Sequence, residues 1–498
     1  MGVVLRQSVK TTFVIFFGAL LGAVINFVYI YAMSKTELGL LTNILYQGSI
    51  IQFLALLGTG HLIATYIQKY DVDDEKRKVL IGFSCVVTII ANVLFTTLYF
   101  SLKSFVLSRY QVQDREYLNK FYHLLPVLSV VWSLMSVFEF YLYSQSKAAI
   151  TTFMKEILLR AFNLLLIGAF FYKILSFSGF MVSSVLVYTV PTILLVYFAR
   201  KTQGFGISFN YKVFSKEEYK ELIHFSWYHL LLGFAMNVLG AIDLLMVGAL
   251  DKTGMESIAI YRNAVFLVSI MIIPYKAITL ASFPTLNQTY IENDTQKMHS
   301  LFHRSAVNIL IVAIGMFLLI ALNLDNFIAF INQLKSGYDD VKPIVLILMI
   351  GQLVNMGTGL NNEMLSISKY YRYGFYTAII LLALTVILNR IFIPQYGIYG
   401  AAWSSTAALA IFNIIKSVVV WRKLKMSPLS SNTYKVLIAG AIAGCAGYVL
   451  PFCVNLYADT ILRSVIIIVA YTIALLLLRA SDDVNNYINA LLKTRKLY

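Results

Sequence analysis

The stretch KRKVLIGFSCVVTIIANVLFTTLYFSL, residues 76–102, consists of three basic residues followed by 24 residues without a charge. About 20 apolar residues in a helix cross the ~30 Å hydrocarbon core of a bilayer, so residues 79–102 are predicted to form a transmembrane helix. The chain contains fourteen such stretches, at residues 11–32, 40–68, 79–102, 120–143, 149–172, 179–199, 221–249, 257–283, 304–324, 341–368, 374–393, 398–421, 435–455 and 461–478.

The basic residues lie mostly in every second connection between these predicted spans. With the N-terminus placed in the cytoplasm, the cytoplasmic segments and the adjoining span ends carry 25 Lys and Arg. The opposite side carries 10, and five lie deeper within spans. Positive charge stays on the side of synthesis, so both termini are predicted to be cytoplasmic.

The composition excludes an ordinary soluble domain, because 59% of the residues are hydrophobic and only 13% are charged. In lipid every backbone polar group must be paired within the protein, and the alternating segments typical of a β-barrel do not occur. The sequence therefore predicts an all-α polytopic membrane protein. The net charge of +16 is scattered over short connections, so we expect attraction to anionic membrane lipids and no nucleic-acid partner.

The chain also contains an internal repeat at an offset of 221–222 residues. Three short pairs of segments match in order: 143–147 with 365–369, 179–184 with 400–405, and 200–201 with 422–423. Contacts between small residues of neighbouring helices are an alternative explanation for the second pair. A repeat of six spans has the same orientation in both halves, so two parallel six-helix lobes are predicted.

The predicted domains follow from this repeat. They are an N-terminal lobe at 1–200, a cytoplasmic linker at 201–220, a C-terminal lobe at 221–425, and two extra helices with a cytoplasmic tail at 426–498. The linker is expected to end at a helix start, with Ser215 as the N-cap and Glu218 three residues later. A cleft between two such lobes is the usual place for a transported substrate, which passes by rocking of one lobe against the other.

The predicted span at 257–283 has the sharpest chemical signal. Charged side chains within a membrane are costly and usually face a partner or a wet cavity. Arg262 and Lys276 are fourteen residues apart, which places them on one helix face about 21 Å apart. Two such cations suit successive positions of a phosphate or pyrophosphate, and Pro274 between them is expected to bend the helix. The alternative is that both cations snorkel to the membrane interfaces.

Three other charged residues within spans are candidates for binding or charge balance. Asp243, in the preceding span, is expected either to pair with Arg262 or to take part in ion coupling. Arg160 is a candidate for substrate contact, and the alternative is that Glu156, four residues earlier, neutralises it. Lys416 is expected to snorkel to the cytoplasmic interface.

Three further side chains are candidates for a gate, a hinge or a proton relay. Glu139 and Glu363 lie shortly before the first matching segments of the repeat and are gate or hinge candidates, with solvation near the interface as the alternative. His61 follows Gly58-Thr59-Gly60, where the glycines allow a kink. It is a candidate for a proton relay, and the alternative is a hydrogen-bonded structural histidine. The sequence contains no metal-ligand spacing and no phosphate-binding loop.

Several segments together resemble the bacterial polysaccharide flippases of the O-antigen and capsule type. They are 37–39 (ELG), 57–60 (LGTG), 243–250 (DLLMVGAL), 261–264 (YRNA), 283–286 (FPTL), 304–305 (RS) and 393–402 (IPQYGIYGAA). The resemblance covers nearly the whole chain and implies the multidrug/oligosaccharidyl-lipid/polysaccharide exporter superfamily, with two lobes in a V around a central cavity lined by spans 1, 2, 7 and 8.

The same resemblance implies a function in the bacterial cytoplasmic (inner) membrane. Such proteins flip undecaprenyl-pyrophosphate-linked oligosaccharide units to the outer leaflet for surface polysaccharides such as lipopolysaccharide O-antigen. Polysaccharide polymerase and glycosyltransferases would be protein partners. No cofactor is implied, and coupling to H⁺ or Na⁺ is left open.

Two other functions remain as alternatives at this stage. The first is an ion-coupled multidrug exporter of the same superfamily, although the spans contain five cations against four anions, which suits organic cations poorly. The second is an integral-membrane glycan transferase or polymerase. Such enzymes tend to present catalytic residues in a large outer loop, and the outer connections here are short. The sequence therefore favours a transporter over an enzyme.

Overall fold

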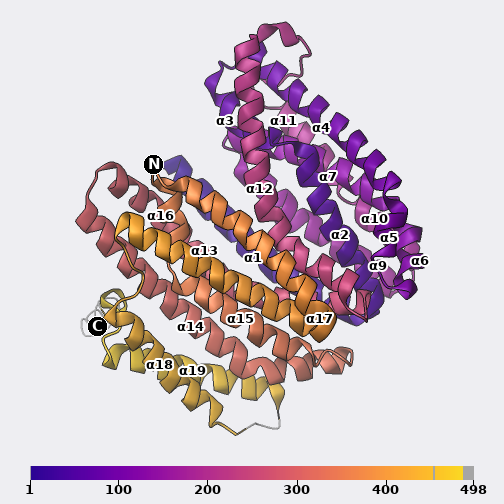
Figure 1. Ribbon diagram of the computed structural model, residues 1–498. Helices are drawn as coiled ribbons and strands as arrows, with labels where there is room; N and C mark the ends of the chain where they lie inside the picture. Colours follow the sequence, from indigo (N-terminus) through magenta and orange to yellow (C-terminus); the bar gives the residue numbers. More distant parts are fainter. Residues whose placement is uncertain (1, 452–454, 486–498) are drawn as a thin grey trace. The chain divides into compact units, whose positions relative to one another are not determined.

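The computed structural model describes residues 2–451 and 455–485, and within these residues the chain forms helices and no β-strand (Figure 1). The predicted all-α class is confirmed. Eight helices of the described chain are long and apolar enough to cross a membrane, and a bent pair of helices adds a ninth. Each predicted span overlaps a helix, but the number of fourteen crossings and the cytoplasmic placement of both termini stay predictions.

The helices divide into two compact units, Met1–Ala259 and Ile260–Tyr498. The predicted lobes were bounded by the sequence repeat at 200 and 221, whereas the packing places α12 with the first unit. The helices and short helical turns of the first unit are α1 (Gly2–Ala32), α2 (Lys35–Leu56), α3 (Thr59–Tyr66), η1 (Ile67–Lys69), α4 (Glu75–Ser101), α5 (Lys103–Ser108), α6 (Val112–Phe121), α7 (Leu124–Ser144), α8 (Ala148–Phe153), η2 (Met154–Leu158), α9 (Leu159–Phe171), α10 (Phe177–Leu186), α11 (Thr189–Arg200), η3 (Tyr211–Val213) and α12 (Lys216–Leu250).

In the first unit α2 packs between α7 and α12, as Figure 1 shows. The predicted kink of the second span is confirmed, because Leu57 and Gly58 have φ of 48° and 75° and separate α2 from α3. A Cβ at Gly58 would lie 2.0 Å from the carbonyl oxygen of Ser226 on α12. Glycine is therefore required here both for its left-handed conformation and for close packing.

The segment predicted as a linker packs against the first unit. The Ser208 N–H donates to the carbonyl oxygen of Lys78 at 3.2 Å, and Phe214 is buried in the hydrophobic cluster formed by α3, α4, α7 and α11. The predicted N-cap is confirmed: Ser215 and Glu218 form a reciprocal capping box at the start of α12. The Lys76 ammonium donates to Glu218 at 2.6 Å, and this hydrogen bond lowers the pKa of Glu218.

The outer face of α4 supports the membrane assignment. Ile90, Val93 and Leu94 are 62%, 62% and 64% exposed. Such a continuous apolar surface would be costly in water and is stable against lipid tails.

The second unit contains most of α13 (Met255–Ile291), together with α14 (Thr295–Leu334), α15 (Val341–Gly357), α16 (Asn361–Ile367), α17 (Tyr371–Leu424), α18 (Ser431–Tyr448) and α19 (Leu456–Leu477). The 54 residues of α17 are two helices joined at Gly397, which has φ 59° and ψ −139°. A Cβ at Gly400 would lie 2.2 Å from the carbonyl oxygen of Phe392. The two spans predicted at 374–393 and 398–421 are thus separated at this tight connection.

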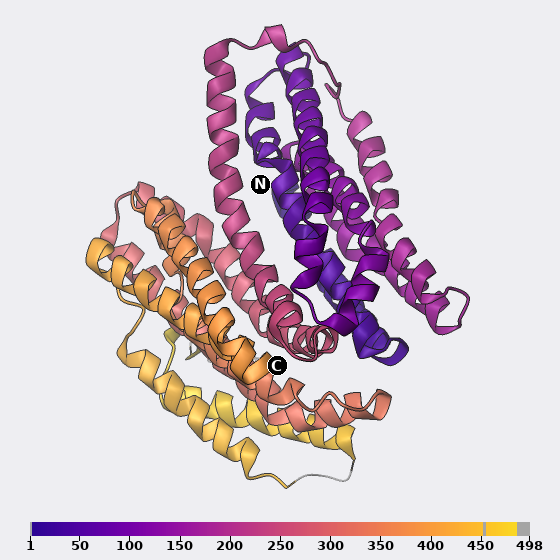
Figure 2. The ribbon, with the colours of Figure 1, turned by 45° about the vertical axis from the view of Figure 1, so that its right-hand side comes forward.

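The last two helices form a pair that packs along α14 (Figure 2). The apolar contact joins Ile314 and Leu318 of α14 to Ala439 and Ala443 of α18 and Ile467 of α19. Small residues on α18 allow this close approach. The predicted cytoplasmic tail beyond residue 485 lies outside the described residues.

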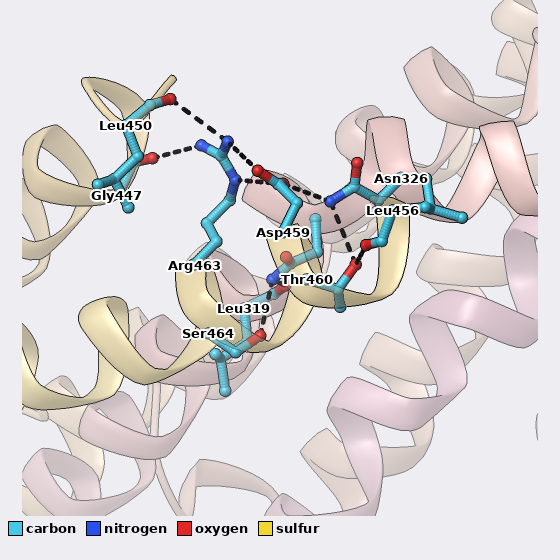
Figure 3. A network of polar contacts seen from close by, with 10 residues as sticks. Leu319, Asn326, Gly447, Leu450, Leu456, Asp459, Thr460, Arg463 and Ser464 are labelled. Atoms are coloured by element: carbon cyan, nitrogen blue, oxygen red, sulfur yellow. Dashed lines mark hydrogen bonds and ion pairs between the residues drawn. The ribbon is translucent and has the colours of Figure 1, made fainter. Parts of the chain in front are cut away.

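A buried ion pair lies between the end of α18 and the start of α19 (Figure 3). Asp459 and Arg463, each 3% exposed as side chains, approach to 3.2 Å. The Arg463 guanidinium also donates to the carbonyl oxygens of Gly447 and Leu450 at 2.6 and 3.3 Å, and Asn326 of α14 donates to Asp459 at 2.6 Å. The guanidinium therefore caps the end of α18 while its charge is neutralised within α19.

We expect Arg463→Met to lower the free energy of unfolding by about 3–5 kcal/mol, because Asp459 would remain buried without its counter-charge. Thermal unfolding of the purified protein in detergent measures this loss. The double variant Asp459→Leu with Arg463→Met should recover most of it, since both buried charges are removed. A double variant as unstable as the single one would contradict this account.

Candidate functional site

Arg160 lies at the contact between α9 and α1. Its Nη2 is 2.6 Å from Glu156 Oε2, and its Nη1 donates to the carbonyl oxygen of Gly18. Cβ atoms at Gly18 and Gly22 would lie 2.8 Å from the Glu156 Cβ and 2.5 Å from the Arg160 Nη1. The alternative of neutralisation by Glu156 is confirmed, while substrate contact by Arg160 stays a prediction.

Glu139 belongs to the same region of the first unit. It is 5% exposed, the Lys155 ammonium donates to its two oxygens at 2.8 and 2.9 Å, and the Tyr143 hydroxyl donates at 2.8 Å. Solvation near the interface is therefore the wrong explanation for Glu139, because the side chain is buried and paired. Its role as a gate or hinge stays a prediction.

A turn of π-helix links these two ion pairs. Met154–Leu158 adopts this wider form, and the Leu159 N–H bonds the carbonyl oxygen of Met154. Lys155 and Glu156 are consecutive in the turn, so one points its charge to Glu139 on α7 and the other to Arg160 on α9. Such π-turns often occur at functional sites, and no pattern in the sequence indicates this one. Together the four side chains carry no net charge.

His61 is enclosed by aromatic rings. It stacks on His229 of α12 with a centroid distance of 4.9 Å and an interplanar angle of 20°, and it contacts Phe140 of α7 at 5.0 Å. The sequence suggested a hydrogen-bonded histidine or a relay, and the structure adds ring stacking across α3, α7 and α12. Its role in proton transfer stays a prediction.

The predicted pyrophosphate positions lie on a single helix. Arg262 is half-buried and Lys276 is exposed, and α13 continues through Pro274. Asp243 is half-buried on α12. Asp243 belongs to the first unit and Arg262 to the second, so their pairing stays a prediction, as does the hinge role of Pro274.

Two charged residues of the second unit are buried, contrary to expectation. Lys416 is 4% exposed and Glu363 is 9% exposed. The Lys416 ammonium lies 4.0 Å from the centroid of the Phe412 ring. Snorkelling of Lys416 and interface solvation of Glu363 are therefore wrong. Sequence distance from a span end does not reveal which way the helix face points.

The first unit also contains a cavity of about 370 Å³ among α2, α6, α10 and the start of α13. Its lining includes Glu37, Asp114 and Glu256. Asp114 accepts the Met255 N–H at 3.1 Å, and burial raises the pKa of Asp114. The cavity is acidic and contains none of the predicted pyrophosphate ligands, so its lining suits an anionic group poorly.

Replacing Glu139 tests its ion pair with Lys155. We expect Glu139→Gln to lower the free energy of unfolding by about 1.5–3 kcal/mol, because hydrogen bonds to a charged group are lost. Glu156→Gln is the matched control on the same turn. Its side chain is 30% exposed, so the expected loss is about 1 kcal/mol or less. Equal losses in detergent melts would show that Glu139 is not the more strongly paired carboxylate.

The sequence profile of the family "polysaccharide biosynthesis protein" matches residues 4–290. No curated protein matches the sequence significantly.

Among solved structures, the lipid II flippase MurJ in an inward closed conformation aligns with a TM-score of 0.76 at 12% identity, covering 94% of this chain and 98% of that one. An inward-facing multidrug resistance MATE family transporter of the MOP superfamily aligns with a TM-score of 0.64 at 15% identity, covering 82% and 94%. A MOP superfamily transporter from Pyrococcus furiosus aligns at 0.56 and 14% identity, covering 84% and 95%. These similarities show the fold, which is that of MurJ and the MATE transporters.

Proposed function

This chain belongs to the polysaccharide biosynthesis protein family, and from that premise we propose that it is a flippase for lipid-linked oligosaccharides. The substrate would be an undecaprenyl-pyrophosphate-linked repeat unit, moved across the bacterial cytoplasmic membrane by alternating access. The family match over residues 4–290 carries this proposal. The cations on α13 support it, because a pyrophosphate needs positive partners wherever it leaves water.

In this mechanism the sugar passes through the protein while the polyprenyl tail stays in lipid. The pyrophosphate meets Arg262 and then Lys276, which are about 21 Å apart on one continuous helix. The guanidinium offers a bidentate fork, and the ammonium offers a point charge with three donors. We propose that Asp243 either takes part in ion coupling or balances the charge of Arg262.

Arg160 has a lesser part in this proposal. Its guanidinium already contacts a carboxylate and a backbone carbonyl. An anion could bind there only after Glu156 is displaced. We therefore place the main pyrophosphate contacts on α13.

Deletion of the gene tests the function itself. We expect loss of surface polysaccharide, such as O-antigen, and accumulation of pyrophosphate-linked repeat units on the cytoplasmic leaflet. Extraction of lipid-linked intermediates and an assay of surface glycan measure the two effects. Glycosyltransferases that build the repeat unit and the polymerase that uses it are the proposed partners.

Variants on α13 test the mechanism. We expect Arg262→Ala and Lys276→Ala each to lower glycan export by about 10- to 100-fold, the equivalent of a charge-assisted hydrogen bond of about 1.5–3 kcal/mol. Arg390→Ala is the matched control, since Arg390 is an exposed cation of another span. Normal export by Arg262→Ala at normal protein level would remove this residue from the mechanism.

The multidrug exporter is the second candidate, because the fold is shared with MATE transporters. A deletion strain with normal surface glycan and new sensitivity to cationic drugs would favour it. In that case the cations of α13 would serve as interface anchors.

A further inference from the structure

The second unit contains a polar layer between the broken span α15–α16 and the second half of α17. Asn361 of α16 donates to the hydroxyl oxygen of Ser417 at 2.8 Å, and the Thr358 hydroxyl donates to Asn413 at 3.3 Å. Asn361 and Asn413 are 1% and 0% exposed. Lys416 and Glu363 extend this layer, so it contains both hydrogen-bonding and ionisable groups.

Two acceptors in this layer lack donors. Glu363 Oε2 and Asn361 Oδ1 are buried without a hydrogen-bond partner among the described residues. Native proteins rarely leave buried acceptors in this condition, because each costs the desolvation of the group. A carboxylate in this environment favours a bound proton or the approach of a cation.

Lys416 of α17 and Tyr275 of α13 are the titratable side chains of the described chain that interact electrostatically with Glu363. The described residues contain no ion pair within 4.0 Å between Glu363 and Lys416, in contrast to Glu139 and Lys155. The two charges are therefore close enough to influence each other but are not joined. Such a pair titrates as a unit.

The ligand of this layer is a proton rather than a metal ion. Glu363 is its single carboxylate among the described residues, and no group of three or more His, Cys, Asp or Glu side chains able to hold a metal occurs in that part of the chain. The ammonium of Lys416 would repel a metal cation. It would not prevent protonation of Glu363, because the bound proton only neutralises the carboxylate.

The backbone beside Glu363 is bent at a break between two helices. α15 and α16 meet at 46° across a break of three residues, and Gly359 in this break has φ 63°. Glu363 lies on the short helix that follows the break, and Lys416 lies on the helix that packs against it. A change in the charge of Glu363 therefore acts directly across a hinge.

We propose that Glu363 and Lys416 form a proton-binding site, and that loading and release of this proton move α16 relative to α17 during transport. With the proton bound, Glu363 is neutral and Lys416 carries the only charge of the pair. After release, the carboxylate attracts the ammonium and draws α16 toward α17. The coupling to transport rests on the proposed flippase function, whereas the proton site stands on the contacts alone.

The proton site is tested by infrared spectroscopy of the full-length protein in lipid, titrated between about pH 5 and pH 9. We expect a carboxylic acid C=O band that is lost as the pH rises and that is absent from Glu363→Gln. Lys416→Met should shift the midpoint to higher pH by about one unit or more, because the cation favours the ionised carboxylate. Glu292→Gln, at an exposed position, is the control and should keep the band unchanged.

A wild-type spectrum without such a band, or a midpoint that Lys416→Met leaves in place, would overturn the proton site. Because Lys416→Met retains Glu363, the test holds even if Glu363→Gln fails to fold.

Coupling is tested in cells, where Glu363→Gln imitates the loaded state permanently. We expect at least a tenfold loss of surface glycan at normal protein level. Full export by this variant would overturn the coupling and leave the spectroscopic result unchanged. If deletion of the gene leaves surface glycan and lipid-linked intermediates unchanged, the flippase function and its coupling are both wrong, while the infrared titration still decides the proton site.

Discussion

The structure depends on one constraint: lipid offers no hydrogen-bond partner to a backbone group. The chain can leave helical geometry inside a span only where its own atoms satisfy the freed groups. At the break between α2 and α3, the Leu57 N–H bonds the carbonyl oxygen of Leu54, and the Thr59 hydroxyl bonds that of Leu56 at 2.6 Å. The break at Gly359, inside the predicted span 341–368, likewise occurs at a glycine with positive φ. Flexibility within the membrane is therefore confined to a few positions.

The same constraint governs charge. Asp459 with Arg463 and Glu139 with Lys155 are joined by direct ion pairs. The Arg463 guanidinium also donates to a backbone carbonyl oxygen, and the Tyr143 hydroxyl donates to Glu139. A fully buried pair such as Asp459 with Arg463 adds little net stability over apolar packing, but losing one partner is costly. These pairs therefore fix the geometry of their helices. Glu363 and Lys416 are not joined by a direct ion pair. They are therefore the titratable pair best suited to change its protonation state.

The sequence was sufficient to predict the features that arise from local chemistry. The apolar stretches predicted the helices, the glycines at 58–60 predicted the break in the second span, and Ser215 with Glu218 predicted a helix start. It also suggested the Glu156–Arg160 pair from four-residue spacing. The same spacing joins Asp459 to Arg463, a pair that was not predicted.

Features that depend on which helix face meets which neighbour were not predictable. The burial of Lys416 was missed because a residue one turn from the membrane edge can point either to the interface or to the packed interior. The π-turn at 154–158, which packs against α1, was missed because it has no composition of its own. The acidic cavity depends on helices distant in sequence that meet only in the folded chain.

An intramembrane cation that is already paired within the protein is a poorer ligand for an anion than an unpaired one. This criterion says more about the predicted ligands than their positions in the sequence do. Arg160 would have to give up a carboxylate at 2.6 Å and a carbonyl before it could bind a phosphate, and breaking these contacts would offset much of the new attraction. Lys276 is exposed and has its three donors available at the surface of α13. A substrate that must bind and leave in each cycle needs contacts whose formation and loss cost about the same. An exposed ammonium meets that condition better than a guanidinium locked in a structural pair.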